Sequence, residues 1–274
     1  TTKTVWAFPS RDDFNGESLT DEPYRDFIKE LSDKGYEIAF HGAGSGVFDR
    51  AETLQAMEMI KELVGYYPGL HINHAFNNHN LYWEGKRFSF PLSALYTFSK
   101  RMFNLPGVDS LGEAENSPYF WGDFAKQRIK YIRNRVFTGL NTINYDRHMP
   151  YREKGKAAYS NYWFSSSNGS DCRDFLDLVS FKNIDQLERQ NGCAIVYTHF
   201  ARGFVDAAGV LNEDFKNHIA YLAGKNGWFA PASAVLDCLK RDRKEAVYLN
   251  YAQSLSLDLR WSAGIIARKV LGRR

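Results

Sequence analysis

The sequence has few cysteines, and their spacing excludes the protein classes that depend on paired thiols. Only three occur in 274 residues, Cys172, Cys193 and Cys238, and no two of them form a Cys-x-x-Cys motif. An odd number of widely spaced cysteines indicates neither a disulfide framework nor a zinc ribbon. We therefore expect reduced thiols.

Long apolar runs are also missing. No run approaches the roughly 18 to 20 residues that span a bilayer, and the first residues lack the pattern of a signal peptide. We expect a cytoplasmic location on this basis. The chain does not begin with Met, so a preceding segment could have been removed.

A strong charge of one sign is absent as well. The net charge is +3, from 35 basic and 32 acidic residues. Nine of the basic and three of the acidic residues lie from Lys240 onward, which leaves 26 basic against 29 acidic residues before it. A nucleic-acid-binding protein usually carries its basic face on the folded domain. This distribution therefore argues against DNA or RNA as a partner.

The basic C-terminal tail, from about residue 240, ends in RWSAGIIARKVLGRR, where cations alternate with large apolar residues. That mixture suits a helix at the surface of an anionic membrane, which would give weak peripheral contact. It equally suits a terminal helix packed on the rest of the chain. We favour packing, because apolar residues at helical spacing usually face a core.

What the chain does contain is enough apolar residues for one large core. The hydrophobic fraction is 44% and the aromatic fraction 15%. Single α/β barrels commonly reach about 250 residues, so we expect one domain over residues 1–274. The aromatic excess also suits stacking on sugar rings, although core packing explains most aromatic residues.

Strands and helices alternate in the first third of the chain. TVWAF (4–8), YEIAF (36–40) and HINHAF (71–76) are rich in β-branched and aromatic residues, which is typical of buried strands. Helices are predicted between them at 20–35 and 54–64, where capping residues and apolar spacing agree. This order indicates a parallel sheet and an α/β barrel.

The later chain gives a weaker pattern. We expect loops and helices that cover the barrel over 80–136. Beyond it, regularity returns in GLNTINYD (139–146), in YSNYWFSSS (159–167) and in 184–190, which leads into CAIVYTHF (193–200), and we interpret these as the later strands. A helix is predicted at 212–227, followed by a strand WFAP (228–231) and a helix from Ala232.

Polar residues follow four of the predicted strands. They are the pair Asp12 and Asp13, then His41, His74 and His199. In a barrel of parallel strands, the carboxyl ends of the strands meet at one mouth, so these side chains would share a site. Each has a plainer reading, because a histidine at a strand end is often structural and the acidic pair could shape a turn.

One carboxylate and two imidazoles are a recurring ligand set for a hydrolytic metal ion. Asp13 and His41 suit two of these positions. The third ligand is His74 or His79, and we prefer His74 because a strand end is more rigid than the loop beyond it.

The remaining groups would perform proton transfer. Asp12 is the candidate general base for a metal-bound water. His199 would protonate the leaving group or stabilise the oxyanion.

The glycine-rich stretch at 41–46 does not match the motifs that it superficially suggests. It lacks the Lys-Ser/Thr of a P-loop and the spacing of a dinucleotide fingerprint, and Ala43 and Val47 stand where a serine-hydrolase elbow needs glycines. The glycines either let the backbone pass close to a substrate or metal, or form a flexible loop.

Five segments together resemble the polysaccharide deacetylase superfamily, the NodB-homology or carbohydrate esterase family 4 group, in a divergent bacterial branch. They are SRDDFNG, KGYEIAFHGAGSG, NHAFNNHNLYW, WFSSSNGSD, and YTHFARGF with its continuation to GWFAPASAVLDCL. The resemblance covers most of the chain. It implies a distorted (β/α) barrel with zinc or another divalent ion, and removal of an acyl group from a sugar.

The resemblance carries over residue by residue. It makes Asp12 similar to the family's base, Asp13 and His41 to two metal ligands, and His199 to the catalytic histidine of the last motif. The usual second histidine ligand is replaced by Ser45, and His74 could supply the missing imidazole.

Two further motifs differ from the family. The arginine-proline motif is replaced by Asn73-His74 and the asparagines after it, and the acidic motif reads Asn168-Gly169-Ser170-Asp171. Asp171 would orient His199 or cap a helix. The candidate substrate-binding residues are Asn77, Asn78, Trp83 and Trp163.

We therefore expect a metal-dependent hydrolase that removes an acyl group, in the first instance acetyl, from an amino sugar of a bacterial glycan or its precursor. One alternative is a non-catalytic carbohydrate-binding relative. Another is a glycoside hydrolase that uses two carboxylates among Asp12, Asp13, Asp146 and Asp171.

Overall fold

The structure is a computed structural model that describes residues 1–104, 107–241, 243 and 245–270. It consists of two compact units, each built from separate segments. Unit 1 comprises residues 1–134, 150–164 and 230–258, and unit 2 comprises 135–149, 165–229 and the chain from 259 onward. The expectation of a single domain stays a prediction.

Six strands form one sheet in the order in which they occur in the sequence. They are β1 (Thr2–Val5), β2 (Glu37–Phe40), β3 (Leu70–Ile72), β4 (Tyr131–Phe137), β5 (Tyr162–Asn168) and β6 (Val196–Tyr197). The pairs β1–β2, β2–β3, β3–β4 and β5–β6 are parallel. The α/β class and the parallel sheet are therefore confirmed.

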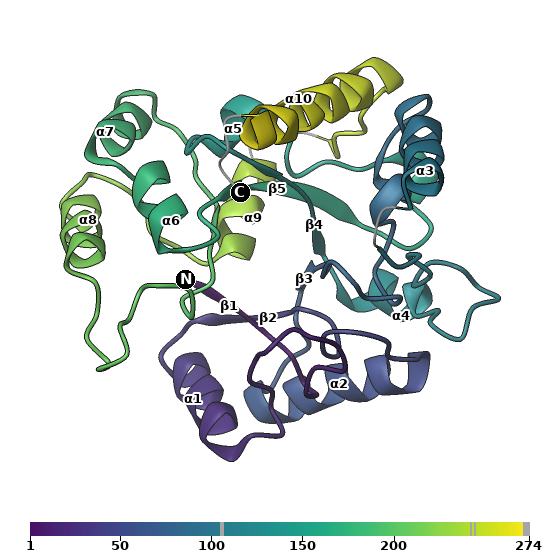
Figure 1. Ribbon diagram of the computed structural model, residues 1–274, viewed down its shortest axis with the longest axis horizontal. Coiled ribbons are helices and arrows are strands. Elements are labelled where there is room, and N and C mark those ends of the chain that lie inside the picture. The colour runs from purple at the N-terminus through teal and green to yellow at the C-terminus, as the bar shows by residue number, and fades with distance from the viewer. Residues whose placement is uncertain (105–106, 242, 244, 271–274) are drawn as a thin grey trace. The chain divides into compact units, whose positions relative to one another are not determined.

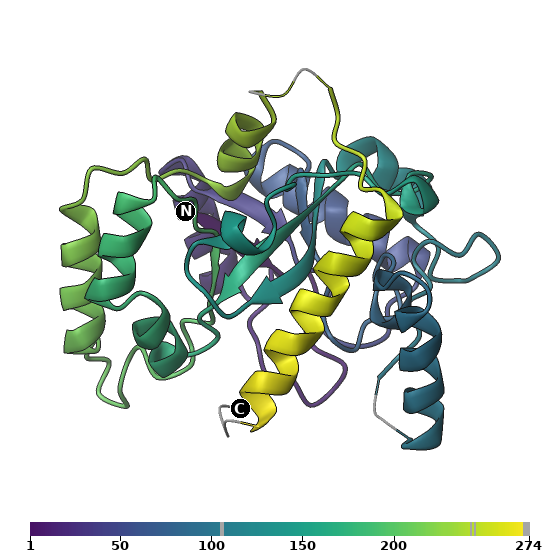
Figure 2. The same cartoon turned by 90° about the horizontal axis from the view of Figure 1, so that it is seen from above.

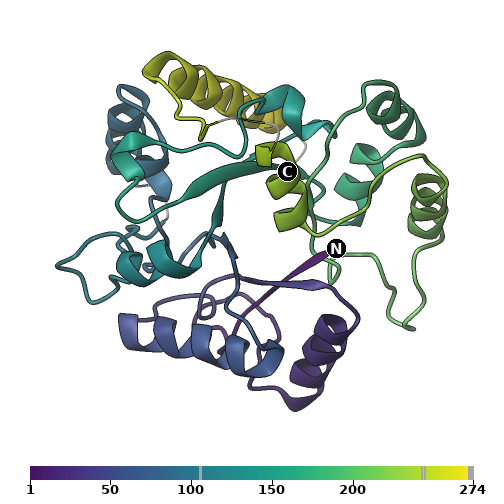
Figure 3. The same ribbon diagram turned by 180° about the vertical axis from the view of Figure 1, so that it is seen from behind.

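Two helices of unit 1 lie where the sequence predicts helices, although the second begins four residues before the predicted 54–64. Helix α1 (Glu22–Asp33) has a proline in its first turn and is followed by Gly35 at φ 84°. Helix α2 (Arg50–Val64) starts with a capping box between Asp49 and Glu52 and ends at Gly65 in the left-handed conformation. Both lie beside β1 and β2 (Figures 1 and 3).

The core of unit 1 forms between these helices and the strands. Ile28 of α1, Met57 and Ile60 of α2, and Ile38 and Phe40 of β2 are all fully buried. Tyr24 and Ile28 form the buried face of α1, and Phe27 beside them is 47% exposed.

The remaining elements of unit 1 follow β3 or return from later in the chain. They are the 3-10 helix η1 (Glu84–Arg87), α3 (Leu92–Met102), α4 (Gly122–Arg128), the 3-10 helix η2 (Lys154–Lys156) and α9 (Ala232–Arg241). The predicted helix from Ala232 is thus confirmed. Its first backbone N–H donates to Thr2 Oγ1 at 2.8 Å, which fixes α9 to β1.

Unit 2 has its own apolar cluster. Helices α6 (Cys172–Leu178), α7 (Phe181–Arg189) and α8 (Glu213–Ala223) lie together in Figure 1 and enclose the buried Phe175, Ile184 and Phe204. Cys172, Cys193 and Cys238 are free thiols.

Three predictions for the later chain are wrong. The segment 139–146 contains a short helix, α5 (Thr142–Tyr145), rather than a strand. WFAP is not a strand, and its Trp228 and Phe229 are 62% and 58% exposed. Strand β4 lies at the end of the stretch that we assigned to loops and helices. The sequence did not indicate a buried strand there because it contains Arg133 and Arg135, yet both arginines are buried.

The C-terminal tail forms α10 (Tyr251–Val270), a single helix that starts in unit 1 and ends in unit 2 (Figure 2). Residues 271–274 of the predicted basic tail lie outside the described residues. In the part of the chain that the structure describes, no helix combines the length and the apolar composition needed to cross a membrane.

Candidate active site

The candidate site of unit 1 forms where three neighbouring strands end. His41 directly follows β2, and His74 lies two residues after β3. Val5 pairs with Phe40 and Phe40 with His71 in parallel register. These strands therefore end at the same edge, and the prediction that their polar residues meet is confirmed for His41 and His74.

The two imidazoles face each other. Their ring centroids are 5.2 Å apart and the ring planes are nearly perpendicular. Trp6, which follows β1, stacks parallel to His41 at 5.9 Å and meets His74 edge-on at 5.3 Å. Phe14 contacts the other side of His74 at 4.9 Å. Sequence reasoning missed both aromatic residues, although Trp6 lies in a predicted strand.

Ser45 connects Asp12 with His74. Its hydroxyl donates to Asp12 Oδ2 at 2.7 Å, and its oxygen lies 3.3 Å from His74 Nδ1. Because the serine has one proton and the carboxylate is the stronger acceptor, we assign the second contact as Nδ1–H of His74 donating to Ser45. Ser45, which stands where the resembling family has a histidine, thus occupies the centre of the cluster.

Asp12 is held in one orientation by further hydrogen bonds. Its Oδ1 accepts from Ser10 Oγ at 2.8 Å and from the backbone N–H of Phe14 at 3.0 Å. Desolvation by itself raises the pKa of Asp12. The hydrogen bonds, with a smaller contribution from His74, outweigh it and leave the pKa below its usual value. Asp12 is therefore ionised at neutral pH.

In both His41 and His74, Nδ1 is the ring nitrogen that contacts an oxygen acceptor. His41 Nδ1 lies 3.3 Å from the carbonyl oxygen of Ile72, so this nitrogen carries the proton. In both rings Nε2 is then the nitrogen left for an ion or another ligand. Burial, followed by repulsion from His74, Arg133 and His71, places the pKa of His41 well below its ordinary value. The ring is neutral, which is the form that binds metals.

Asp13, the proposed carboxylate ligand, is exposed. Among the residues that the structure describes, no group of three or more His, Cys, Asp or Glu side chains is arranged to hold an ion. The donor chemistry of His41 and His74 fits a divalent metal, since each directs its protonated nitrogen to an oxygen acceptor as metal-binding histidines commonly do. The ligand role of Asp13 stays a prediction.

His79, the alternative ligand, is completely buried behind the glycine-rich loop. Its Nε2 accepts from the backbone N–H of Ala43 and from the Asn77 amide, both at 3.3 Å. Burial lowers the pKa of His79 to about 3, with smaller effects from His71 and His74. Its lone pair is already used, so the geometry favours His74 as the ligand.

Asn77 holds the glycine-rich loop (41–46) in place through two hydrogen bonds. Its Oδ1 accepts from Gly46 N and its Nδ2 donates to Gly44 O, both at 2.8 Å. Gly42 has φ 92°, and a Cβ there would lie 2.6 Å from His79 Nε2. Gly42 is therefore needed for its backbone conformation and for its close approach to His79 and Asn77. Asn77, which is 1% exposed, uses its amide for this loop rather than for a ligand.

The other candidate substrate-binding residues differ in accessibility. Trp83 is partly exposed, with the guanidinium of Arg87 3.4 Å above its ring. Asn78 is partly buried. Trp163 is completely buried and has no surface open to a ligand in this structure.

His199 and Asp171 belong to unit 2. His199 Nδ1 lies 3.0 Å from the carbonyl oxygen of Ser170, and its Nε2 lies 3.0 Å from the hydroxyl of Tyr197. The Asp171 side chain accepts from Asp174 N at 2.8 Å and caps α6, the plainer of its two predicted roles. The catalytic roles of His199 and Asp171 stay predictions.

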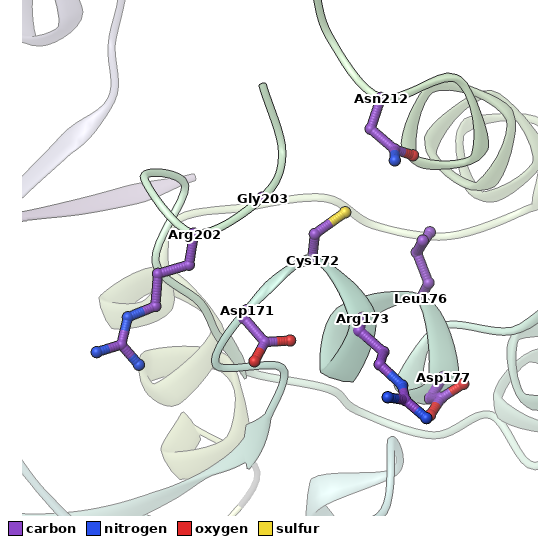
Figure 4. Close-up of a pocket in the computed structure, with 8 residues that line it drawn as sticks. All are labelled: Asp171, Cys172, Arg173, Leu176, Asp177, Arg202, Gly203 and Asn212. Atoms are coloured by element: carbon purple, nitrogen blue, oxygen red, sulfur yellow. The ribbon is translucent and has the colours of Figure 1, made fainter. Parts of the chain in front are cut away.

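Asp171 also lines an open pocket of about 550 Å³ in unit 2. Figure 4 shows four charged side chains among those that line it, Asp171, Arg173, Asp177 and Arg202. Opposite charges at its rim give it no preference for an anionic or a cationic ligand.

No family model, curated protein or solved structure matches this chain.

Proposed function

We propose that this protein is a metal-dependent hydrolase that removes an acetyl or related acyl group from an amino sugar, within a distorted (β/α) barrel of the polysaccharide deacetylase type. The observation that carries the proposal is the pair His41 and His74. The two rings lie at adjacent strand ends with Nδ1 directed to an oxygen acceptor, the pKa of His41 is well below its ordinary value, and Ser45 joins His74 to an ionised Asp12.

In this proposal His41 and His74 hold the ion through Nε2, and Asp13 is the third protein ligand. Zinc or another divalent ion, when bound, would lower the pKa of a water molecule and polarise the acyl carbonyl. Trp6 covers one face of His41, and Phe14 packs against His74, so both rings are kept in place and partly shielded from bulk water.

Asp12 accepts the proton of the attacking water. Its Oδ2 is oriented by Ser45 and its Oδ1 by Ser10 and the Phe14 backbone, so the carboxylate cannot rotate without breaking several hydrogen bonds. The same hydrogen bonds lower its pKa and make it a weaker base than a free aspartate. A carboxylate of this strength suits a water whose pKa is already lowered, which is the chemistry that a bound divalent ion would supply.

Acetate release is the direct test. The purified protein, with zinc added, is incubated with N-acetylglucosamine oligomers, and both acetate and new reducing ends are measured. We expect acetate without new reducing ends, and loss of acetate release in Asp12→Asn by about 10²-fold or more. New reducing ends without acetate would instead identify a two-carboxylate glycoside hydrolase.

A non-catalytic carbohydrate-binding protein is the second candidate. It is favoured by one observation, that His41 and His74 have no third His, Cys, Asp or Glu in a metal-binding arrangement within the described residues. If the chain is such a binding protein, it would bind the same oligomers but release neither acetate nor new reducing ends. It would also contain no stoichiometric metal after purification in zinc-containing buffer.

A further inference from the structure

Helix α3 exposes apolar side chains to solvent, whereas an ordinary surface helix turns them toward the core. None of its residues is buried. Leu95, Phe98 and Met102, at i, i+3 and i+7, share one face and are 59% to 64% exposed. An amphipathic helix normally turns such a stripe toward the core.

The opposite, polar face of α3 is the one that contacts the protein. The Tyr96 hydroxyl donates to Glu84 of η1, and Lys100 Nζ lies 3.7 Å from the same carboxylate. A Cβ added at Gly85 would lie 3.1 Å from Thr97 Oγ1. Polar contacts to η1 therefore determine the orientation of the helix and hold its apolar face outward.

The exposed surface continues beyond both ends of the helix. Phe90, just before α3, is 70% exposed, and Phe103, just after it, is 73% exposed. Together with Leu95, Phe98 and Met102 they form what we call the α3 apolar face. A patch of five large apolar side chains from one short segment marks an interaction site rather than scattered surface residues.

We propose that the α3 apolar face lies in the surface of an anionic membrane. The segment from Gly85 to Val108 has no acidic residue and four basic ones, Lys86, Arg87, Lys100 and Arg101. Lys86 and Lys100 are paired with Glu113 and Glu84, and Arg87 is buried over the Trp83 ring. Arg101 is exposed beside the apolar face and is the cation that would meet an anionic surface. Phenylalanines and leucine on one face with a cation at its edge are typical of helices that lie in the interface.

The shape of the patch also favours a bilayer. Its side chains come from a single helix about 16 Å long and its two flanks, at the periphery of unit 1 in Figure 2. A bilayer can accept a row of side chains from one helix without a matching groove. Contact through α3 would be peripheral, because the helix is much too short to span a membrane.

Vesicle co-sedimentation of the full chain tests this proposal. The vesicles contain either equal parts of phosphatidylglycerol and phosphatidylcholine or phosphatidylcholine alone. We expect binding to the anionic vesicles, several-fold weaker binding to the neutral ones, and at least about tenfold weaker anionic binding for the double variant Phe98→Asp, Met102→Asp.

Two matched variants distinguish the α3 apolar face from the rest of the surface. Val205→Asp with Val210→Asp places the same charges on exposed apolar residues of unit 2, and Arg260→Glu with Ile266→Asp alters the C-terminal helix. We expect both to bind like the unaltered protein. The proposal is overturned if the full chain does not bind anionic vesicles or binds neutral vesicles equally well. It is also overturned if the α3 variant binds like the unaltered protein, or if only the C-terminal variant loses binding.

A second copy of the chain is the remaining competitor for this face. Light scattering would then show a dimer that Phe98→Asp, Met102→Asp converts to a monomer, and this result would also overturn the membrane proposal. Circular dichroism confirms that each variant is folded. Acetate release from soluble oligomers should be the same in the α3 variant as in the unaltered protein, so the outcome is independent of the proposed hydrolase function.

Discussion

Ser45 donates a 2.7 Å hydrogen bond to Asp12 from a fully buried position. Replacing Ser45 with Ala removes a hydrogen bond that stabilises the ionised carboxylate, so the pKa of Asp12 should rise toward its usual value. A lowered carboxyl pKa contributes stability above the unfolded-state pKa and loses it as the pH falls. Ser45→Ala should therefore lower the free energy of unfolding by about 1 kcal/mol at pH 7. The loss is not larger, because Asp12 is exposed and solvent screens its charge.

Urea unfolding measures this loss of stability. In the pH profile of kcat/KM, the decrease on the acid side should occur at higher pH in Ser45→Ala than in the unaltered protein. Ser10→Ala is the matched control, because Ser10 also donates to Asp12, but to Oδ1 rather than to the Oδ2 that faces Ser45. Both variants should shift the acid limb, and only Ser45→Ala should also weaken zinc binding. Equal zinc affinity in the two variants would show that Ser45 does not position His74.

His41 and His74 should contribute equally to metal binding. His74→Ala and His41→Ala should each reduce zinc affinity by more than the roughly 10- to 100-fold that follows loss of a residue that only supports a ligand. Metal content by mass spectrometry after dialysis gives the measurement. His218→Ala, in α8 of unit 2, is the control and should keep its metal. Full zinc content in His74→Ala would remove His74 from the ligand set.

Acid should destabilise the protein through buried histidines. Burial lowers the pKa of His71 to about 4 and that of His79 to about 3, whereas both protonate near pH 6.5 when unfolded. Between these values the unfolded chain binds more protons, so stability is full above pH 6.5 and falls as the pH decreases. For His71 alone the loss by pH 4 is about 3 kcal/mol. Unfolding free energies that are constant from pH 7 to pH 5 would contradict this assignment.

Gly42 should tolerate a side chain much less well than Gly65. Both have a positive φ, 92° and 88°, so alanine at either position carries the left-handed penalty of about 1 kcal/mol. Only at Gly42 would the new Cβ also approach His79 Nε2 to 2.6 Å and Asn77 Nδ2 to 2.8 Å, whereas no atom lies within 4 Å at Gly65. Gly42→Ala should cost about 2–4 kcal/mol in thermal or urea unfolding. Similar losses for the two variants would mean that the loop can move away.

The first three strands and the two helices between them could be predicted because each carries its own local signals. Caps and glycines mark the ends of α1 and α2, and short runs of β-branched and aromatic residues mark β1 to β3. His41 and His74 could be predicted for the same reason, since parallel strands end at one edge. The strand β4 was missed because Arg133 and Arg135, although buried, resemble surface residues in the sequence.

The sequence by itself determined the parallel order of the first three strands, the helices between them and the placement of His41 and His74 at neighbouring strand ends, because these follow from local spacing and chain direction. Only the tertiary structure decided that Ser45 would connect Asp12 to His74, that Asn77 and Trp163 would be buried, and that α3 would turn its apolar face outward. The physical reason is that each of these depends on contacts between residues distant in sequence. Burial and hydrogen-bond partners are properties of the packed chain, and no periodicity in the sequence records them.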